Sequence, residues 1–312
     1  MNTLLSRMAV AFLILAVVTG CARDAASIVK EPPLPDSPDG TVLAAAEALQ
    51  NNRAEILWTA LPESYQSDIT EITHEFAEKL DPEIYDRGFA LIMRAFEVLD
   101  DRKDVILGSE TFKSTGADGD EIRTGLSGTQ VFAQALKSSE VATVDGLGSI
   151  EWGQFLATTG SKILENAAAL ESEDGENPLD ELESLTVETL EISDDRATLR
   201  IGSAEHDPED VEMVRVEGRW IPAEMAEEWP QFVEDARQGL AEMTPENMAA
   251  QKTQIMMFFG MAEGFIEQIA SLQTPEEFDA AIGPILAPML GGDIDMGDEA
   301  EWETAEEETE AE

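Results

Sequence analysis

Cysteine, histidine and basic residues are scarce in this chain of 312 residues. Cys21 is its only cysteine, and His74 and His206 are its only histidines. A single thiol excludes internal disulfides and cysteine-ligated metal clusters. Neither histidine belongs to a pair at the spacing of a zinc-binding helix. We therefore predict no metal site and interpret both histidines as surface side chains beside acidic neighbours.

Positive charge is the second shortage. The chain has 19 Lys and Arg against 66 Asp and Glu, which gives a formal net charge of -47. A surface this acidic repels phosphate backbones and anionic lipid headgroups, so we predict no nucleic-acid partner. Two interpretations of the acidity stay open. It either maintains solubility in a salty medium or forms a surface for cations or a basic protein.

Catalytic motifs are also missing. No nucleophile elbow, phosphate loop or dinucleotide fingerprint occurs. Carboxylate pairs such as Glu63 with Asp68, or Asp81 with Glu83, are too common among 66 acids to indicate acid–base chemistry. The acidic runs 118–121 and 293–298 do not fit the twelve-residue calcium loop. We predict no catalytic, cofactor or metal-binding residue, and an acid-based hydrolase is only our third interpretation.

Long apolar runs are absent as well. The runs 255–262 and 280–290 are shorter than the roughly 20 residues that a membrane-spanning helix needs. The run 8–18 is of similar length and follows Arg7. A short apolar core after a positive charge is typical of a signal peptide. We therefore predict that residues 1–20 are an export leader.

The leader closes with Val18-Thr19-Gly20-Cys21. This tetrapeptide resembles the lipobox of bacterial lipoproteins, whose cysteine is acylated and becomes the N-terminus. The resemblance implies a lipid, palmitate included, on Cys21, and Ala22 resembles the residue that directs outer-membrane sorting. Two or three acyl chains anchor a protein stably. We expect an outer-membrane lipoprotein facing the periplasm of a Gram-negative bacterium. An ordinary signal peptide and a short membrane anchor are the alternatives.

Composition divides the rest of the chain. Residues 21–40 contain four prolines and no hydrophobic period, which predicts a lipid-anchored flexible spacer. Residues 41–292 carry the periodic apolar patterns of a folded domain. Residues 293–312 hold eleven acids and no base, which predicts a disordered acidic tail. The length of the central part suits one large core or two small subdomains.

Hydrophobic periodicity predicts a predominantly helical α+β fold. Apolar residues recur at helical spacing over 62–80, 81–99, 152–170, 222–243, 244–272 and 274–290. The period changes to two between about 185 and 222, where turn residues separate three or four short runs. We predict helices packed on one face of an antiparallel meander, and a loop over 109–127.

Methionines and phenylalanines gather in 255–266. One interpretation is plain helix core with Phe258 and Phe259 directed inward. The other is a soft pocket, because methionine adapts to irregular apolar ligands.

Residues 58–68 read Trp-x-x-Leu-Pro-x-Ser-Tyr-Gln-x-Asp, and a hairpin ends at 214–222. The first segment resembles uncharacterised exported bacterial proteins. The wider layout loosely resembles NTF2-like α+β lipoproteins, in which helices pack on a curved antiparallel sheet. About 100 mostly helical residues separate the two parts here, and that family implies no common activity.

Taken together, these features predict a lipid-anchored, non-catalytic lipoprotein that acts through contacts with an envelope protein. The alternative is a binding module that holds a small apolar ligand in a cavity between helices and sheet.

Overall fold

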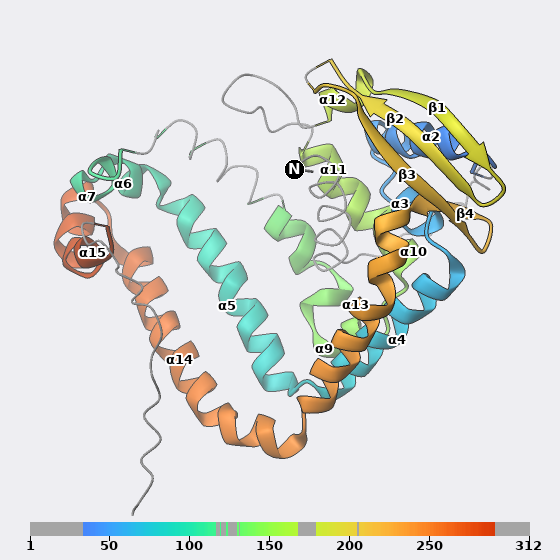
Figure 1. Cartoon of the computed structure of the whole chain (residues 1–312). Coiled ribbons are helices and arrows are strands. Elements are labelled where there is room, and N and C mark those ends of the chain that lie inside the picture. Colours follow the sequence, from blue (N-terminus) through green and yellow to red (C-terminus); the bar gives the residue numbers. More distant parts are fainter. Residues whose placement is uncertain are drawn as a thin grey trace, which may run out of the picture. The chain divides into compact units, whose positions relative to one another are not determined.

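The computed structural model describes residues 34–116, 119, 123, 130, 132–167, 179–204 and 206–290. These residues form helices and one four-stranded antiparallel sheet (Figure 1), which confirms the predominantly helical α+β class. Cys21, residues 293–312 and the segments 124–129 and 168–178 lie outside the described residues. The fold has two compact units. One comprises Met1–Lys103 and Asp118–Ser271, and the other comprises Asp104–Ala117 and Leu272–Glu312.

The sheet is the predicted meander, with strand order β1-β2-β3-β4. Its strands are β1 (Thr186–Ser193), β2 (Arg196–Gly202), β3 (Glu209–Val216) and β4 (Arg219–Pro222). Glu217 and Gly218 have φ values of 50° and 80°. Two consecutive residues with positive φ form the tight turn whose twist matches an antiparallel hairpin.

Helices cover the sheet on two sides. Helix α2 (Pro38–Gln50) lies across one face, where Val42 packs on a cluster that includes Leu199 and Trp220 (Figure 1). Helix α13 (Ala223–Glu242) covers the other face at β3 and β4. The prediction of a single buried face is therefore wrong for these strands. In β4, Trp220 points towards the first cluster, while the next residue, Ile221, packs beside Trp229 of α13.

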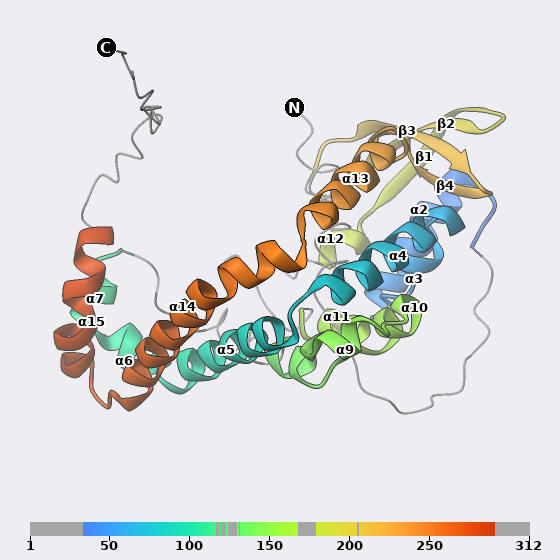
Figure 2. The same cartoon turned by 90° about the horizontal axis from the view of Figure 1, so that it is seen from below.

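Four long helices form two parallel pairs, seen side by side in Figure 2. Helix α4 (Glu63–Lys79) packs with α13, and α5 (Pro82–Asp101) packs with α14 (Pro245–Ser271). A lysine joins the two helices of each pair near the breaks in the chain. The Lys79 ammonium donates to the Leu240 carbonyl at 2.8 Å, at the ends of α4 and α13. Lys252 of α14 forms an ion pair with Asp81, the residue that caps α5.

The largest apolar cluster lies under short helices. These are α3 (Ile56–Thr59), η1 (Glu140–Ala142), α9 (Val144–Leu147), α10 (Trp152–Phe155) and α11 (Ser161–Ala167). A π-helix, η2 (Leu156–Gly160), joins α10 to α11. Phe155 and Ile150 are 1% exposed, and Trp152 stacks 6.3 Å from Trp58. One further turn, α12 (Asp180–Glu183), leads into β1. The helix predicted over 152–170 is thus three joined segments.

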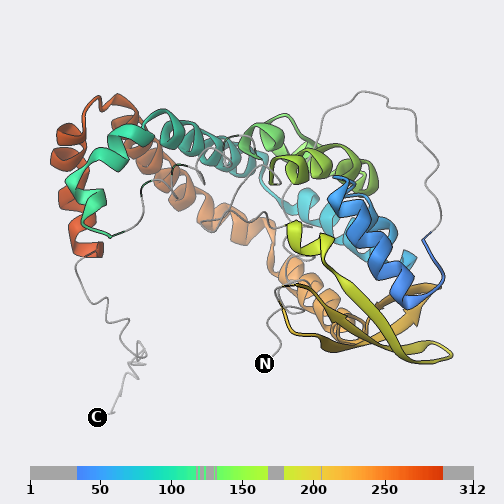
Figure 3. The ribbon, with the colours of Figure 1, turned by 90° about the horizontal axis from the view of Figure 1, so that it is seen from above.

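The second unit contains α7 (Glu110–Lys113) and α15 (Pro275–Leu290), with α6 (Lys103–Gly108) leading into it. Helices α7 and α15 lie side by side (Figure 3). The Asp279 carboxylate accepts from the backbone amides of Glu110 and Thr111 at 3.0 and 2.7 Å. Part of the predicted loop 109–127 is therefore helical. A carboxylate from α15 supplies the acceptors that the first turn of α7 needs.

Candidate docking surface

The two histidines lie far apart in sequence and on different elements. His74 is half-buried on α4, and its Nε2 has no hydrogen-bond partner among the described residues. His206 is exposed, and its Nδ1 lies 2.7 Å from Glu181 Oε1. Within the described ranges, no group of three or more His, Cys, Asp or Glu side chains converges to hold a metal ion.

Three of the four acids considered in the sequence, Asp68, Asp81 and Glu83, form ion pairs between helices. Asp68 accepts from the Trp229 indole nitrogen at 3.0 Å and from Arg237 at 3.1 Å. Asp81 and Glu83 both lie 2.8 Å from the Lys252 ammonium. The hydrogen bond from Lys252 holds the pKa of Asp81 below its usual range. Asp68, Asp81 and Glu83 are each paired with a cation from another helix, which suits fixing helices together.

The two segments that carry the resemblance to exported proteins pack against each other. Leu61 and Tyr65 share a cluster with Ile221 at the end of the hairpin. The Tyr65 ring stacks on Trp229 with centroids 4.0 Å apart and planes 1° from parallel. The Glu217 carboxylate, in the hairpin turn, accepts from the Ser64 amide at 2.9 Å, and this bond lowers the pKa of Glu217. The segment 58–68 therefore fixes the hairpin to α4.

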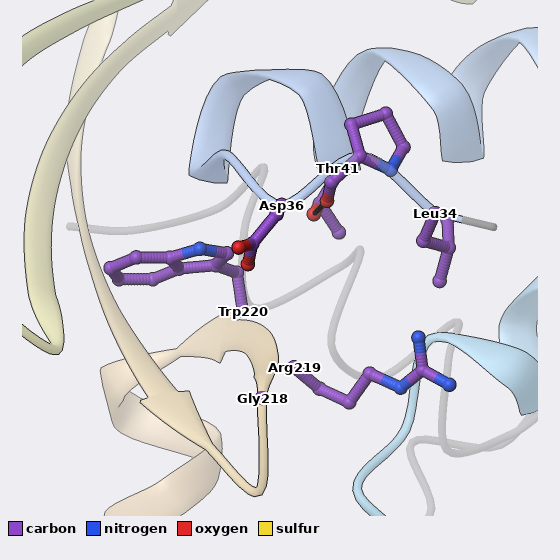
Figure 4. A pocket seen from close by; sticks show the side chains of 7 residues that line it. Leu34, Asp36, Thr41, Gly218, Arg219 and Trp220 are labelled. Carbon is purple, nitrogen blue, oxygen red and sulfur yellow. Dashed lines mark hydrogen bonds between the residues drawn. The ribbon is translucent and has the colours of Figure 1, made fainter.

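A small pocket lies where the chain enters α2, beside the β3–β4 turn (Figure 4). Its volume is about 170 Å³, and the side chains that line it include Leu34, Asp36, Arg219 and Trp220. Asp36 forms an ion pair with Arg215 at this edge of the sheet. Small-molecule sites usually measure about 300–1,000 Å³. This pocket suits a single side chain or a few water molecules better than an apolar ligand.

Helix α14 carries the most exposed large apolar side chains among the described residues, and none of its residues is fully buried. Met257, Phe258 and Met261 are 62%, 59% and 60% exposed. The prediction that Phe258 points inward is wrong, and these three side chains form neither core nor pocket. The exposed face continues along the helix. We name it the α14 stripe, and it consists of Ala250, Gln254, Met257, Phe258, Met261, Gly264 and Gln268.

The opposite face of α14 explains this orientation, because it is held on α5 by polar contacts. Arg87 forms a two-point contact with Glu263 at 2.8 and 2.7 Å, and Arg94 donates to Glu267 at 2.9 Å. The hydrogen bonds from the arginines lower the pKa of Glu263 and of Glu267. Gly88 of α5 leaves room for the Phe259 ring, which would lie 3.1 Å from a Cβ there. Phe259 therefore points towards α5, and Phe258 points away.

The sequence carries no clear signal for the α14 stripe. Hydrophobic periodicity finds an apolar helix here, but it cannot distinguish a buried face from an exposed one. Residues 247–262 contain no Asp or Glu, yet residues 122–139 are also free of acids and include the buried Ala133 and Leu136. The missing acids therefore do not distinguish an exposed face from a buried one.

Among the described residues, no helix combines the length and the hydropathy required to cross a membrane. Comparison with known protein families, with curated proteins and with solved structures finds no match to the chain.

Proposed function

We propose that this protein is a non-catalytic lipoprotein of the bacterial cell envelope that acts by docking another protein on the α14 stripe. The leader and lipobox-like segment support a lipid on Cys21 and a position on the outer membrane, facing the periplasm. Asp68 and Asp81, which belong to the carboxylate pairs weighed for acid–base chemistry, form ion pairs with Arg237 and Lys252 and hold helices together.

One observation carries this proposal: the apolar, acid-free surface of α14. Full burial of a Met or Phe side chain contributes about 1.5–3 kcal/mol. Since Met257, Phe258 and Met261 each expose about three fifths of their surface, covering all three would contribute roughly 3–5 kcal/mol. Adjacent exposed apolar side chains of this kind support a protein contact site.

A small-ligand binding module is the second candidate. The pocket beside the β3–β4 turn lies at a junction of helix and sheet, as that function requires. Its volume of about 170 Å³ is smaller than usual ligand sites, and charged Asp36 and Arg219 contribute to its lining. The α14 stripe is therefore the better-supported binding surface.

Lipid attachment is tested by Cys21→Ser in the full chain. We expect this change to abolish palmitate labelling in growing cells, because a serine hydroxyl cannot form the thioether that holds the diacylglyceryl group. The variant should accumulate as an uncleaved or released protein. Labelling equal to that of the unchanged chain would contradict the anchor.

Docking is tested with a photoreactive amino acid in the α14 stripe. Placed at Gln254 or Gln268, it should form covalent adducts with another polypeptide in intact cells. Gln238, an exposed glutamine of α13, is the matched control position and should give few adducts. Adduct yields that are equal at all three positions would show that the α14 stripe is no special surface.

A further inference from the structure

The sequence intervals between the residues of the α14 stripe indicate what kind of structural element can pack on it. Apart from Phe258, its members follow each other at alternating intervals of four and three residues: Ala250, Gln254, Met257, Met261, Gly264 and Gln268. This is the spacing of a coiled-coil seam, in which side chains of one helix fit between those of another. The partner that fits such a seam is an α-helix.

Charge then distinguishes among partner helices. The seam positions carry no charge, so they offer nothing to select a basic partner. Two copies of this chain, by contrast, repel each other wherever carboxylates face one another, since the net charge is -47. The α14 stripe lets two copies meet without burying an acid. We propose that the partner is a second copy of this chain, bound through the α14 stripe.

The sizes of the seam side chains set the direction of this pairing. Parallel pairing would place each seam residue opposite its own copy, so that Gln254 faces Gln254 and Gly264 faces Gly264. Antiparallel pairing instead places Gln254 opposite Gly264 and Ala250 opposite Gln268. Because large side chains then face small ones at these positions, the two α14 helices run antiparallel.

Side-chain sizes agree with antiparallel packing. Met257 of one copy lies opposite Met261 of the other, and Gln254 lies opposite Gly264. A Cβ added at Gly264 or Gly260 meets no atom within 4 Å, so open space lies in front of both glycines. Gln254 of one copy thus faces a glycine of the other, while Met257 and Met261 meet at the centre of the seam, and the glycines let the two helices approach closely.

The pairing rests on the contact surface of the proposed function and also on its membrane anchor. From Ala250 to Gln268 the seam is about 27 Å long at 1.5 Å per residue. One helix pair of this length buries less than the roughly 800 Å² per partner of a standard interface. A shared membrane raises the local concentration of the two chains and compensates for the small contact.

Disulfide trapping in intact cells tests this pairing in the full lipidated chain. Two differently tagged copies are expressed together, one with Gln254→Cys and the other with Gly264→Cys. Cys21 is the only native cysteine and is acylated in the proposed function, so the new thiols have no competitor. We expect a mixed disulfide between the two tags. Gln254→Cys expressed alone should give no dimer, and neither should Gln238→Cys paired with Gly264→Cys.

Adding Met261→Glu to both copies should lower the yield of mixed disulfide at least about tenfold, because a carboxylate would then be buried in the seam. Gln238→Glu adds the same charge elsewhere and should leave the yield unchanged. Dimers from Gln254→Cys alone would overturn the antiparallel arrangement. If no disulfide forms, the second copy is ruled out as partner. Photoadducts at Gln254 with a different protein would then still support the proposed docking function. If no photoadducts form either, both the docking function and the pairing of two copies are contradicted.

Discussion

Replacing Trp229 with alanine should lower the free energy of unfolding by about 3–5 kcal/mol, the range for removing a large aromatic from a core. Trp229 is 7% exposed and lies between the Tyr65 ring and the hairpin residue Ile221. Its indole nitrogen also donates to Asp68. The substitution therefore opens a cavity, breaks the ring stack and removes a hydrogen bond at once. Urea denaturation followed by circular dichroism measures the loss.

Two variants separate these contributions. Trp229→Phe keeps a ring on Tyr65 and removes the N–H donor. It should therefore lower the free energy of unfolding clearly less than the alanine variant does. Phe232→Ala, at a neighbouring α13 position that is 36% exposed, should cost about 1 kcal/mol or less. If Trp229→Ala were no more costly than Phe232→Ala, the cluster around Tyr65 would not hold the hairpin to α4.

Gly146→Ala should destabilise the protein by about 3 kcal/mol, at the upper end of the usual cost of overpacking. A Cβ at this position of α9 would lie 2.1 Å from the Glu140 carbonyl oxygen and 2.8 Å from its carbon. Both atoms belong to the backbone of η1, so no side-chain rotation relieves the overlap. The gain in helix propensity, at most about 1 kcal/mol, does not offset this shift. Thermal unfolding measures the difference.

The matched control is Gly239→Ala in α13, where an added Cβ meets no atom within 4 Å. Here only helix propensity and chain entropy change, so we expect the free energy of unfolding to rise by about 0.5–1 kcal/mol. Opposite signs for the two substitutions would confirm the close approach of α9 to η1. A stabilising Gly146→Ala would show that the two backbones lie farther apart.

The sheet and the long helices could be predicted because the signals for them, such as turns and helix starts, each lie within a few consecutive residues. The period of two and the Glu217-Gly218 turn fix the hairpin, and Asp81-Pro82 marks the start of α5. Helix α7 was missed although Ser109 caps it locally by accepting from the Phe112 amide, because a single serine in a polar segment is a weak signal. The two amides before Phe112 donate to Asp279, which is far away in sequence and could not be predicted.

The exposed face of α14 was harder to predict because it depends on which face of that helix meets α5. Periodicity placed Phe258 and Phe259 together in the core, although the two residues point in different directions. The choice between them is made by the contacts of Arg87 and Arg94, which lie one heptad apart on another helix. Such pairings between distant segments are invisible to single-sequence patterns. The anchor at Cys21 remains a prediction from the leader alone.

The contacts on the two sides of α5 have a mechanical consequence. The Tyr85 hydroxyl donates to the Val141 carbonyl at 2.7 Å, and the Val144 amide donates to Asp86 at 2.9 Å, so α5 is fastened to the short helices η1 and α9. On its other side, the contact between Arg87 and Glu263 holds α14. A pull on the α14 stripe would therefore be carried through α5 to the largest apolar cluster.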